Sequence, residues 1–469
     1  RDLGKHLRVL VQVPGGAAKH VGLVLVGQVV QRRGVDEAAD EALGAVGRGT
    51  ARDPRGEGRV AGLEIGAGVG EGTGAEREVD QAAREGATRG RGRGARDLLH
   101  AAVVVLLLDG LQARWPELQA KGIGGPQMAR RGFECLWPSE KLAVHGYSME
   151  VLRRLRELLG IRKQLRERLL RERPGVFIGV DAPDFNLGLE ADLRAAGIKT
   201  VHFVCPSIWA WRAERVEKIR RSADHVLCIF PFEPELLARH GIAATYVGHP
   251  LANVIPRVPD RAGARAALGL APEDEVLAIL PGSRSAEVQY IAPPFFSAAA
   301  LIHQARPATK FIVPAVPLLQ ARIEQLVRSA GLEGAVRVVT GQSHTVLAAC
   351  DATLIASGTA TLEAALFKRP MVIGYHMHPL SWWLMRRKQL QPWVGLPNIL
   401  CGEFVVPELI QDAATPEALC AATLQWLQAR EQQPEKILAL EQRFDALHES
   451  LQRNTSQLAA HAIEKVLAA

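Results

Sequence analysis

The sequence predicts an α/β protein of two Rossmann-like domains, whose parallel sheets face each other across a cleft. Short apolar runs alternate with helical segments from about residue 106 onwards, which is typical of parallel sheets built from βαβ units. The runs fall into two series, and the segment between them, 253–265, contains Pro256 and Pro259. Because prolines of this kind suit a linker, the two series predict two domains.

The predicted strands follow one another in chain order. In the first series they are 176–180, 201–204, 225–230 and 245–247. In the second series they are 276–280, 310–314, 336–339, 352–356 and 371–375. We therefore expect an N-terminal domain over residues 106–255 and a C-terminal domain, ending in helices, over residues 266–469.

A long helix is predicted over residues 149–171. Leucines recur there every three to four residues, with one longer gap, and arginines and lysines crowd the remaining positions. Two interpretations of this basic face stay open. It is either the solvated outer face of an ordinary helix or a surface that sits on anionic lipid headgroups.

The first 105 residues differ in composition from the rest of the chain. No aromatic residue precedes Trp115, whereas 21 of the 44 glycines lie among the first 100 residues. Large side chains that fill a core are lacking, and each glycine adds backbone entropy that folding must overcome. We expect residues 1–105 to be a low-complexity Gly/Ala/Arg-rich segment, either disordered or not native to the protein, as a shifted reading frame would produce.

Composition and charge argue against several classes of protein. The longest apolar run, 101–108, is far shorter than the ~20 residues that span a bilayer. The six cysteines are dispersed, which argues against a disulfide framework or a zinc site and fits a reducing cytosol. The net charge of +7 permits an anionic partner, such as a phosphorylated substrate, an acidic lipid surface or nucleic acid.

Two loops of the second series suit a nucleotide diphosphate. Residues 281–284, Pro-Gly-Ser-Arg, follow a strand, and their glycine and arginine allow backbone N–H groups and a guanidinium to meet phosphate oxygens. Residues 356–359, Ala-Ser-Gly-Thr, open a helix that carries Glu363, whose carboxylate can accept hydrogen bonds from ribose hydroxyls. Each loop alone is also an ordinary turn or helix cap, but two in one domain indicate a sugar nucleotide.

A third candidate follows the first strand of the first series. Residues 181–186 read Asp-Ala-Pro-Asp-Phe-Asn, and carboxylates at a strand end suit proton abstraction. Asp184 can equally cap the next helix, so Asp181, nearer the strand, is the better candidate for a base. No Asp-x-Asp pair typical of metal-held sugar nucleotides occurs, and His249 is expected to be a structural turn residue.

Seven short strings carry a resemblance to a known family. They lie at 122–128, 179–186, 206–212, 231–233, 247–250, 280–284 and 356–363. Together they closely resemble the lipid-A-disaccharide synthase family, from about Leu106 to the C-terminus. The strings Asp-Ala-Pro-Asp-Phe-Asn and Pro-Ser-Ile-Trp-Ala-Trp-Arg are the most specific of the set.

The resemblance implies a GT-B glycosyltransferase of lipid A and lipopolysaccharide biosynthesis in Gram-negative bacteria. Such an enzyme joins UDP-2,3-diacylglucosamine to 2,3-diacylglucosamine 1-phosphate and yields the β-1,6-linked disaccharide 1-phosphate and UDP. It inverts the anomeric carbon without a metal or cofactor and has no nucleic acid partner. It is cytoplasmic, lies peripherally on the anionic surface of the inner membrane and forms a homodimer.

The resemblance also implies roles for individual residues. Asp181 falls on the proposed base, and Asp184 remains the alternative. The UDP-sugar loops would comprise Gly282, Ser283, Arg284, Glu287, Ser357, Gly358, Thr359 and Glu363. A membrane or acyl contact would comprise Trp382, Trp383, Met385, Arg386 and Arg387. A buried tryptophan pair is the alternative for the last group.

One departure separates the chain from the family pattern. The family begins with a strand followed by Gly-Glu-Ala-Ser-Gly-Asp, and no such string occurs here. We therefore expect the first strand of the N-terminal sheet and a loop on the acceptor side to be missing or replaced. The chain as written is then expected to be impaired in folding or activity.

Two other functions are consistent with parts of the sequence. Another GT-B enzyme of UDP-sugars, such as a UDP-GlcNAc epimerase, would share the C-terminal nucleotide loops. A basic RNA-binding protein would use the Arg-Gly run and the basic helix, but the chain lacks the aromatic strings of common RNA-binding modules.

Overall fold

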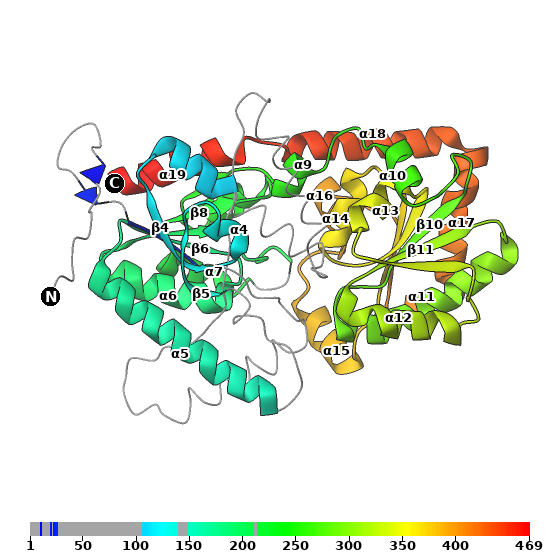
Figure 1. Ribbon diagram of the computed structural model, residues 1–469, viewed down its shortest axis with the longest axis horizontal. Coiled ribbons are helices and arrows are strands. Elements are labelled where there is room, and N and C mark those ends of the chain that lie inside the picture. The colour runs from blue at the N-terminus through cyan, green and yellow to red at the C-terminus, as the bar shows by residue number, and fades with distance from the viewer. Residues whose placement is uncertain (1–9, 12–18, 21, 27–105, 139–148, 211–212) are drawn as a thin grey trace.

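The computed structural model in Figure 1 describes residues 10–11, 19–20, 22–26, 106–138, 149–210 and 213–469. These residues form two α/β lobes side by side, and each lobe is built on one parallel sheet. The prediction of two Rossmann-like domains is confirmed. A two-stranded antiparallel pair, β1 (Leu10–Val11) with β2 (Lys19–His20), lies apart from both sheets.

The N-terminal sheet has seven strands in the order β5-β4-β3-β6-β7-β8-β9. Every neighbouring pair is parallel. The strands are β3 (Gly22–Val26), β4 (Gln119–Gly124), β5 (Glu134–Pro138), β6 (Val176–Val180), β7 (Lys199–Phe203), β8 (His225–Cys228) and β9 (Ala244–Tyr246). All five residues of β6 are buried, as a central parallel strand requires.

The strand β3 decides between the two expectations for the first strand, because its position in the sheet is not empty but replaced. Gly22–Val26 pairs in parallel with both β4 and β6 and so takes a central position in the sheet. Its sequence, Gly-Leu-Val-Leu-Val, is an unbroken apolar run of the kind that forms buried parallel strands. The position is therefore filled by another segment. The rest of the Gly/Ala/Arg-rich segment, apart from the short pair β1–β2, lies outside the described residues.

Helices cover both faces of the N-terminal sheet. Residues 106–114 are helical. The other helices of this part of the chain are α4 (Pro126–Ala129), α5 (Met149–Glu172), α6 (Pro183–Ala195), α7 (Arg215–Ser222), α8 (Glu233–Ala238) and α9 (Pro250–Val254). Figure 1 shows α5 and α6 together on one side of the sheet, and α6 lies directly on β6 and β7.

The long basic helix is present as predicted, and part of its charge is neutralised within the lobe. Leu165 and Leu169 are fully buried. Arg166 pairs with Asp192 of α6, and Arg168 pairs with Glu172 at 2.8 Å. These contacts favour the outer face of an ordinary helix for its C-terminal half, and the side chains of residues 149–155 lie outside the described part.

The C-terminal sheet has six parallel strands in the order β12-β11-β10-β13-β14-β15. The strands are β10 (Val276–Leu280), β11 (Lys310–Ala315), β12 (Val336–Thr340), β13 (Ala352–Ala356), β14 (Met371–Tyr375) and β15 (Glu408–Ile410). Its helices are α10 (Arg261–Ala267), α11 (Ser285–Ala305), α12 (Pro317–Ser329), α13 (Ser343–Ala349), α14 (Thr359–Leu366), α15 (Pro379–Lys388), α16 (Leu396–Cys401) and η2 (Gln411–Ala413). In Figure 1, α11 and α12 cover one face and α13 and α14 the other.

The end of the chain returns to the N-terminal lobe. After α17 (Pro416–Gln432) and α18 (Pro434–Leu451), the last helix α19 (Thr455–Ala468) packs on β7, β8 and β9 (Figure 1). Tyr246 Oη donates to the carbonyl of Ser450 at 2.6 Å, and His249 N–H donates to that of Leu451 at 2.9 Å. The structure thus differs from the expectation that all C-terminal helices belong to the second domain, because the buried face of α19 rests on the first sheet. No helix in the described ranges combines the length and apolar character needed to cross a bilayer.

Candidate active site

A strained turn follows the central strand β6. Asp181 and Ala182 have φ angles of 51° and 30°, so two consecutive residues with side chains adopt left-handed backbone. Such conformations persist only where the surrounding structure holds them, and they gather at functional sites. Asp181 N–H donates to the carbonyl of Phe203 at 2.7 Å. Among the residues that the structure describes, the Asp181 carboxylate has no hydrogen-bond partner, which leaves its oxygens available to a substrate.

The second carboxylate of this turn is engaged differently. Asp184 lies in the first turn of α6, and both of its oxygens lie 2.5 Å from Arg215 Nη2 of α7. The two side chains are only 19% and 11% exposed. A carboxylate whose lone pairs are occupied by a guanidinium has few of them left to accept a hydrogen bond from a substrate, so the geometry separates Asp184 from Asp181.

The two predicted nucleotide loops lie side by side. One follows β10 and the other follows β13, and these strands are neighbours whose register pairs Leu280 with Ile355. Gly282 has φ 115° and Gly358 has φ 153°, which residues with side chains rarely adopt. Each loop runs directly into a helix, so two helix N-termini meet at one edge of the sheet. Backbone N–H groups and positive helix ends suit an anion there.

Glu287 of α11 accepts hydrogen bonds from two residues of the first loop, 281–284. Its Oε2 accepts the backbone N–H of Ser283 at 3.0 Å, and its Oε1 lies 2.6 Å from Arg284 Nη1. A Cβ atom at Gly282 would come within 2.5 Å of the Glu287 side chain. Two donors predicted to meet the diphosphate are therefore held by one carboxylate.

The helix that follows the second loop, α14, carries Glu363, the carboxylate predicted to contact the ribose. Glu363 is 4% exposed, and His344 Nε2 lies 3.5 Å from its Oε2. Ser357 Oγ donates to the carbonyl of Val394 at 3.0 Å, which fixes the loop from the far side. Thr359 is the first residue of α14.

The predicted membrane contact forms the helix α15, at the edge of the C-terminal lobe nearest the N-terminal lobe in Figure 1. Trp383 is 48% exposed and Trp382 half-buried, so they do not form a buried pair. The Arg387 guanidinium lies over the Trp383 ring, 3.7 Å from its centroid, while Arg386 is exposed and Met385 half-buried. The following segment reaches the other lobe, since Leu390 N–H donates to the carbonyl of Ala210 at 3.0 Å.

One buried group was not singled out from the sequence. Glu233 is fully buried, and it accepts hydrogen bonds from the backbone N–H groups of Ile229 and Phe230 and from Trp209 Nε1. Burial raises the pKa of Glu233 to about 8. The sequence feature that could have identified Glu233 is its place in the string Pro-Phe-Glu at 231–233. The Glu233 side chain supports the loop that carries Trp209, and residues 211–212 of this loop lie outside the described part.

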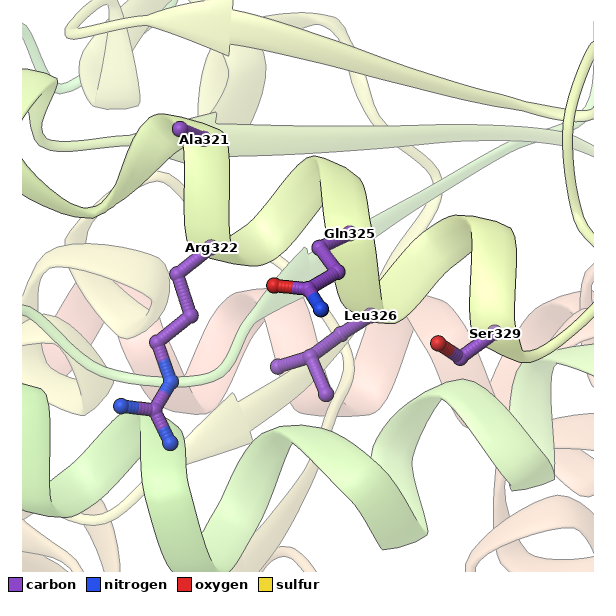
Figure 2. A pocket seen from close by; sticks show the side chains of 5 residues that line it. All are labelled: Ala321, Arg322, Gln325, Leu326 and Ser329. Carbon is purple, nitrogen blue, oxygen red and sulfur yellow. The ribbon is translucent and has the colours of Figure 1, made fainter.

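Two hollows on the described part of the surface lie away from the predicted residues. One of about 470 Å³ lies along α12, as Figure 2 shows. It is lined by Ala321, Arg322, Gln325, Leu326 and Ser329. Because one helix supplies its whole described lining, it lacks the converging polar groups of a substrate site. A second hollow, of about 310 Å³, lies near the ends of β14 and β15 and includes Tyr290, His376 and Gln411.

Two Rossmann-like lobes with paired anion-suited loops at adjacent strand ends define a protein of the GT-B class. A crystal structure of a putative UDP-N-acetylglucosamine 2-epimerase from Listeria monocytogenes is similar in fold. The TM-score is 0.50 at 12% identity, and the match covers 76% of this chain and 90% of that one. At this identity the likeness concerns the fold alone.

Sequence comparison is more specific. Residues 100–463 match the family model described as lipid-A-disaccharide synthetase. A lipid-A-disaccharide synthase of Verminephrobacter eiseniae is 73% identical over 377 residues, covering 80% of this chain and 96% of that protein. One of Albidiferax ferrireducens is 70% identical over 362 residues, covering 77% and 93%. The chain belongs to the lipid-A-disaccharide synthase family, whose members are glycosyltransferases.

This result supports the transferase prediction over the epimerase and RNA-binding alternatives. The match begins at residue 100, a little before the expected Leu106. Most of the first hundred residues thus lie outside the family model, in agreement with the change in composition seen in the sequence.

Proposed function

We propose that the chain transfers the sugar of UDP-2,3-diacylglucosamine to the 6-hydroxyl of 2,3-diacylglucosamine 1-phosphate. The acceptor oxygen forms a bond to the anomeric carbon while the bond from that carbon to the UDP oxygen breaks. The proton of the hydroxyl passes to a base on the enzyme, and UDP leaves with the bonding electrons. Attack opposite the leaving group inverts the anomeric carbon and gives the β-1,6-linked disaccharide 1-phosphate.

Asp181 is the base in this proposal. Its carboxylate lies at the carboxyl end of a central strand, where ligands of Rossmann-like folds bind. Because Asp184 is paired with Arg215, Asp181 is the one of the two with oxygens available to the acceptor hydroxyl. A general base of this kind contributes roughly 10²–10⁴-fold to the rate.

The loops after β10 and β13 hold the UDP in this proposal. The N–H groups beside Gly282, Ser283, Gly358 and Thr359 and the Arg284 guanidinium face the diphosphate, and Ser357 and Glu363 contact the nucleoside. Positive groups fixed in advance stabilise the charge that develops on the departing UDP. Glu287 orients Arg284 and must share it with the diphosphate.

The lipid substrates place further demands on the protein. We assign α15 to the membrane, because it combines exposed Trp383 with exposed Arg386 and Arg387, and such a face suits an anionic surface. The chain would then act on the cytoplasmic side of the inner membrane as a peripheral protein. A homodimer, which the family resemblance implies, belongs to the same proposal.

The single observation that carries the mechanism is the Asp181 turn, with its left-handed backbone and its available carboxylate. The test is UDP release from UDP-2,3-diacylglucosamine, in detergent and excess EDTA, with and without the monosaccharide 1-phosphate. We expect release only with the acceptor and no effect of EDTA. Acceptor-independent interconversion of UDP-GlcNAc would instead establish an epimerase, and loss of activity in EDTA would contradict the electrostatic role of the two loops.

A further inference from the structure

Behind the Asp181 turn lies a fully buried pair of ionisable side chains. Glu190 of α6 and His202 of β7 are both 0% exposed, and Glu190 Oε1 lies 2.8 Å from His202 Nδ1. Within the described residues, Glu190 Oε2 and His202 Nε2 have no hydrogen-bond partner. Apolar residues of similar size would serve stability as well or better, and unsatisfied buried atoms add a cost. The pair therefore indicates a role other than packing.

The pair lies against the strand that leads into the turn. Gly179 of β6 stands opposite His202 in the register of the two strands. A Cβ atom at Gly179 would come within 1.7 Å of Glu190 Oε1 and 3.0 Å of Asn186 Nδ2. Glycine is thus required at this position so that the side chains of α6 can reach the strand two residues before Asp181.

The backbone of Asp181 contacts both α6, which carries Glu190, and β7, which carries His202. Asn186, one helical turn before Glu190, is fully buried, and its Nδ2 lies 3.5 Å from the carbonyl oxygen of Asp181. Asp181 N–H donates to Phe203, the neighbour of His202 in β7. The left-handed backbone at Asp181 is therefore held between α6 and β7.

We propose that Glu190, His202 and Asn186 are positioning residues for Asp181. The Glu190–His202 pair links α6 to β7 and so sets the distance between the two elements that contact the Asp181 turn. Asn186 contacts the carbonyl oxygen of Asp181. None of the three is exposed, so each acts through the backbone of Asp181 and not on the substrate. This inference rests on the proposed function, in which Asp181 is the base.

The test compares substitutions of Glu190 in the full chain. Glu190→Leu is expected to lower kcat about 10–100-fold, since small displacements of a catalytic group have effects of this size. The Kd for UDP should stay unchanged, because the nucleotide loops lie in the other lobe. Glu190→Gln should restore most of kcat, since its amide can still share a hydrogen bond with His202 Nδ1. Where Glu190→Leu fails to fold, the double variant Glu190→Leu/His202→Leu removes both polar partners together.

Thr200→Val is the matched control. Thr200 is buried on β7, the strand that also carries His202. Its Oγ1 lies 3.1 Å from Asp224 Oδ2, away from the Asp181 turn. It should lower thermal stability and leave kcat of the folded enzyme unchanged. Loss of kcat in Glu190→Leu that only matches the unfolded fraction, or a Glu190→Gln variant as inactive as Glu190→Leu, overturns the inference.

Asp181→Asn, measured in parallel, separates the two proposals. An active Asp181→Asn variant contradicts the proposed function, and with it the positioning role. An inactive Asp181→Asn variant together with a fully active, folded Glu190→Leu variant contradicts the positioning role alone.

Discussion

Arg284 and Glu287 form an ion pair at the first turn of α11, with Nη1 and Oε1 2.6 Å apart and both side chains nearly buried. The second oxygen of Glu287 accepts the N–H of Ser283. This carboxylate orders the loop that we assign to the diphosphate, and it also places a negative charge beside that position. Binding of UDP must therefore overcome or exchange these contacts.

Substitution of the two partners should have different effects, one on UDP affinity and the other on turnover. Glu287→Gln keeps hydrogen-bonding capacity but removes the negative charge, so we expect the Kd for UDP to fall about tenfold, or ~1.4 kcal/mol. Arg284→Gln should lower kcat by about 100-fold, because a donor to the departing charge is lost. Calorimetric titration with UDP and initial rates measure the two effects. Weaker UDP binding in Glu287→Gln would mean that the carboxylate itself contacts the nucleotide sugar.

The two aspartates of the β6–α6 turn should respond differently to the same change. Asp181→Asn is expected to reduce kcat by roughly 10²–10⁴-fold with UDP affinity retained, as removal of a general base does. Asp184→Asn leaves the nearly buried Arg215 without its anionic partner, so its main effect should be a lower thermal midpoint. Rates at saturating substrate and thermal unfolding of both variants decide the matter. Equal, modest losses of kcat in both variants contradict the assignment of the base.

Much of the fold follows from the sequence because buried parallel strands have a simple signature. The predicted boundaries of β6, β10, β13 and β14 agree with the structure. Strand β4, Gln-Ala-Lys-Gly-Ile-Gly, lacks that signature, since it contains polar residues and two glycines. Strand β3 has the signature but stands in a segment whose composition argued against order.

The candidate site was predictable only in part, for a similar reason. The loops after β10 and β13 are local motifs, and the parallel sheet brings them together. Pairings across the fold have no local signal. Arg215 lies 31 residues from Asp184, and nothing in either segment predicts that they meet. The buried partners Glu190 and His202 likewise belong to different elements.

The membrane assignment of α15 predicts a charge-dependent affinity for lipid. Arg386→Ser/Arg387→Ser should weaken binding to vesicles containing phosphatidylglycerol about 30-fold, since each arginine near an anionic surface contributes about 1 kcal/mol. Sedimentation with vesicles at low and high salt measures this. Arg322→Ser/Arg328→Ser removes the same charge from the exposed face of α12 and is the control. Equal losses in both double variants would show that net charge, not α15, governs the binding.

His249 should make the fold sensitive to acid. Its Nδ1 accepts the N–H of Leu251 at 3.2 Å as the cap of α9, and its ring stacks on Phe230. Burial lowers the pKa of His249 to about 3, whereas an unfolded histidine has a pKa near 6.5. The unfolded state thus binds more protons between these values. The contribution of neutral His249 to stability is therefore complete above pH 6.5 and is lost as the pH falls towards 3.

The variant His249→Asn keeps an N-cap acceptor and removes the titrating ring. Between pH 6.5 and 5 the wild-type chain should lose roughly 1.6 kcal/mol more unfolding free energy than this variant. The slope rises from half of about 1.4 kcal/mol per pH unit at pH 6.5, where the unfolded histidine is half protonated, towards the full value at pH 5. Denaturant unfolding at several pH values measures the difference. His461→Asn, on the exposed face of α19, should keep the wild-type pH dependence. If His249→Asn keeps it as well, other buried groups must cause the acid sensitivity, and the neutral cap at α9 is not its origin.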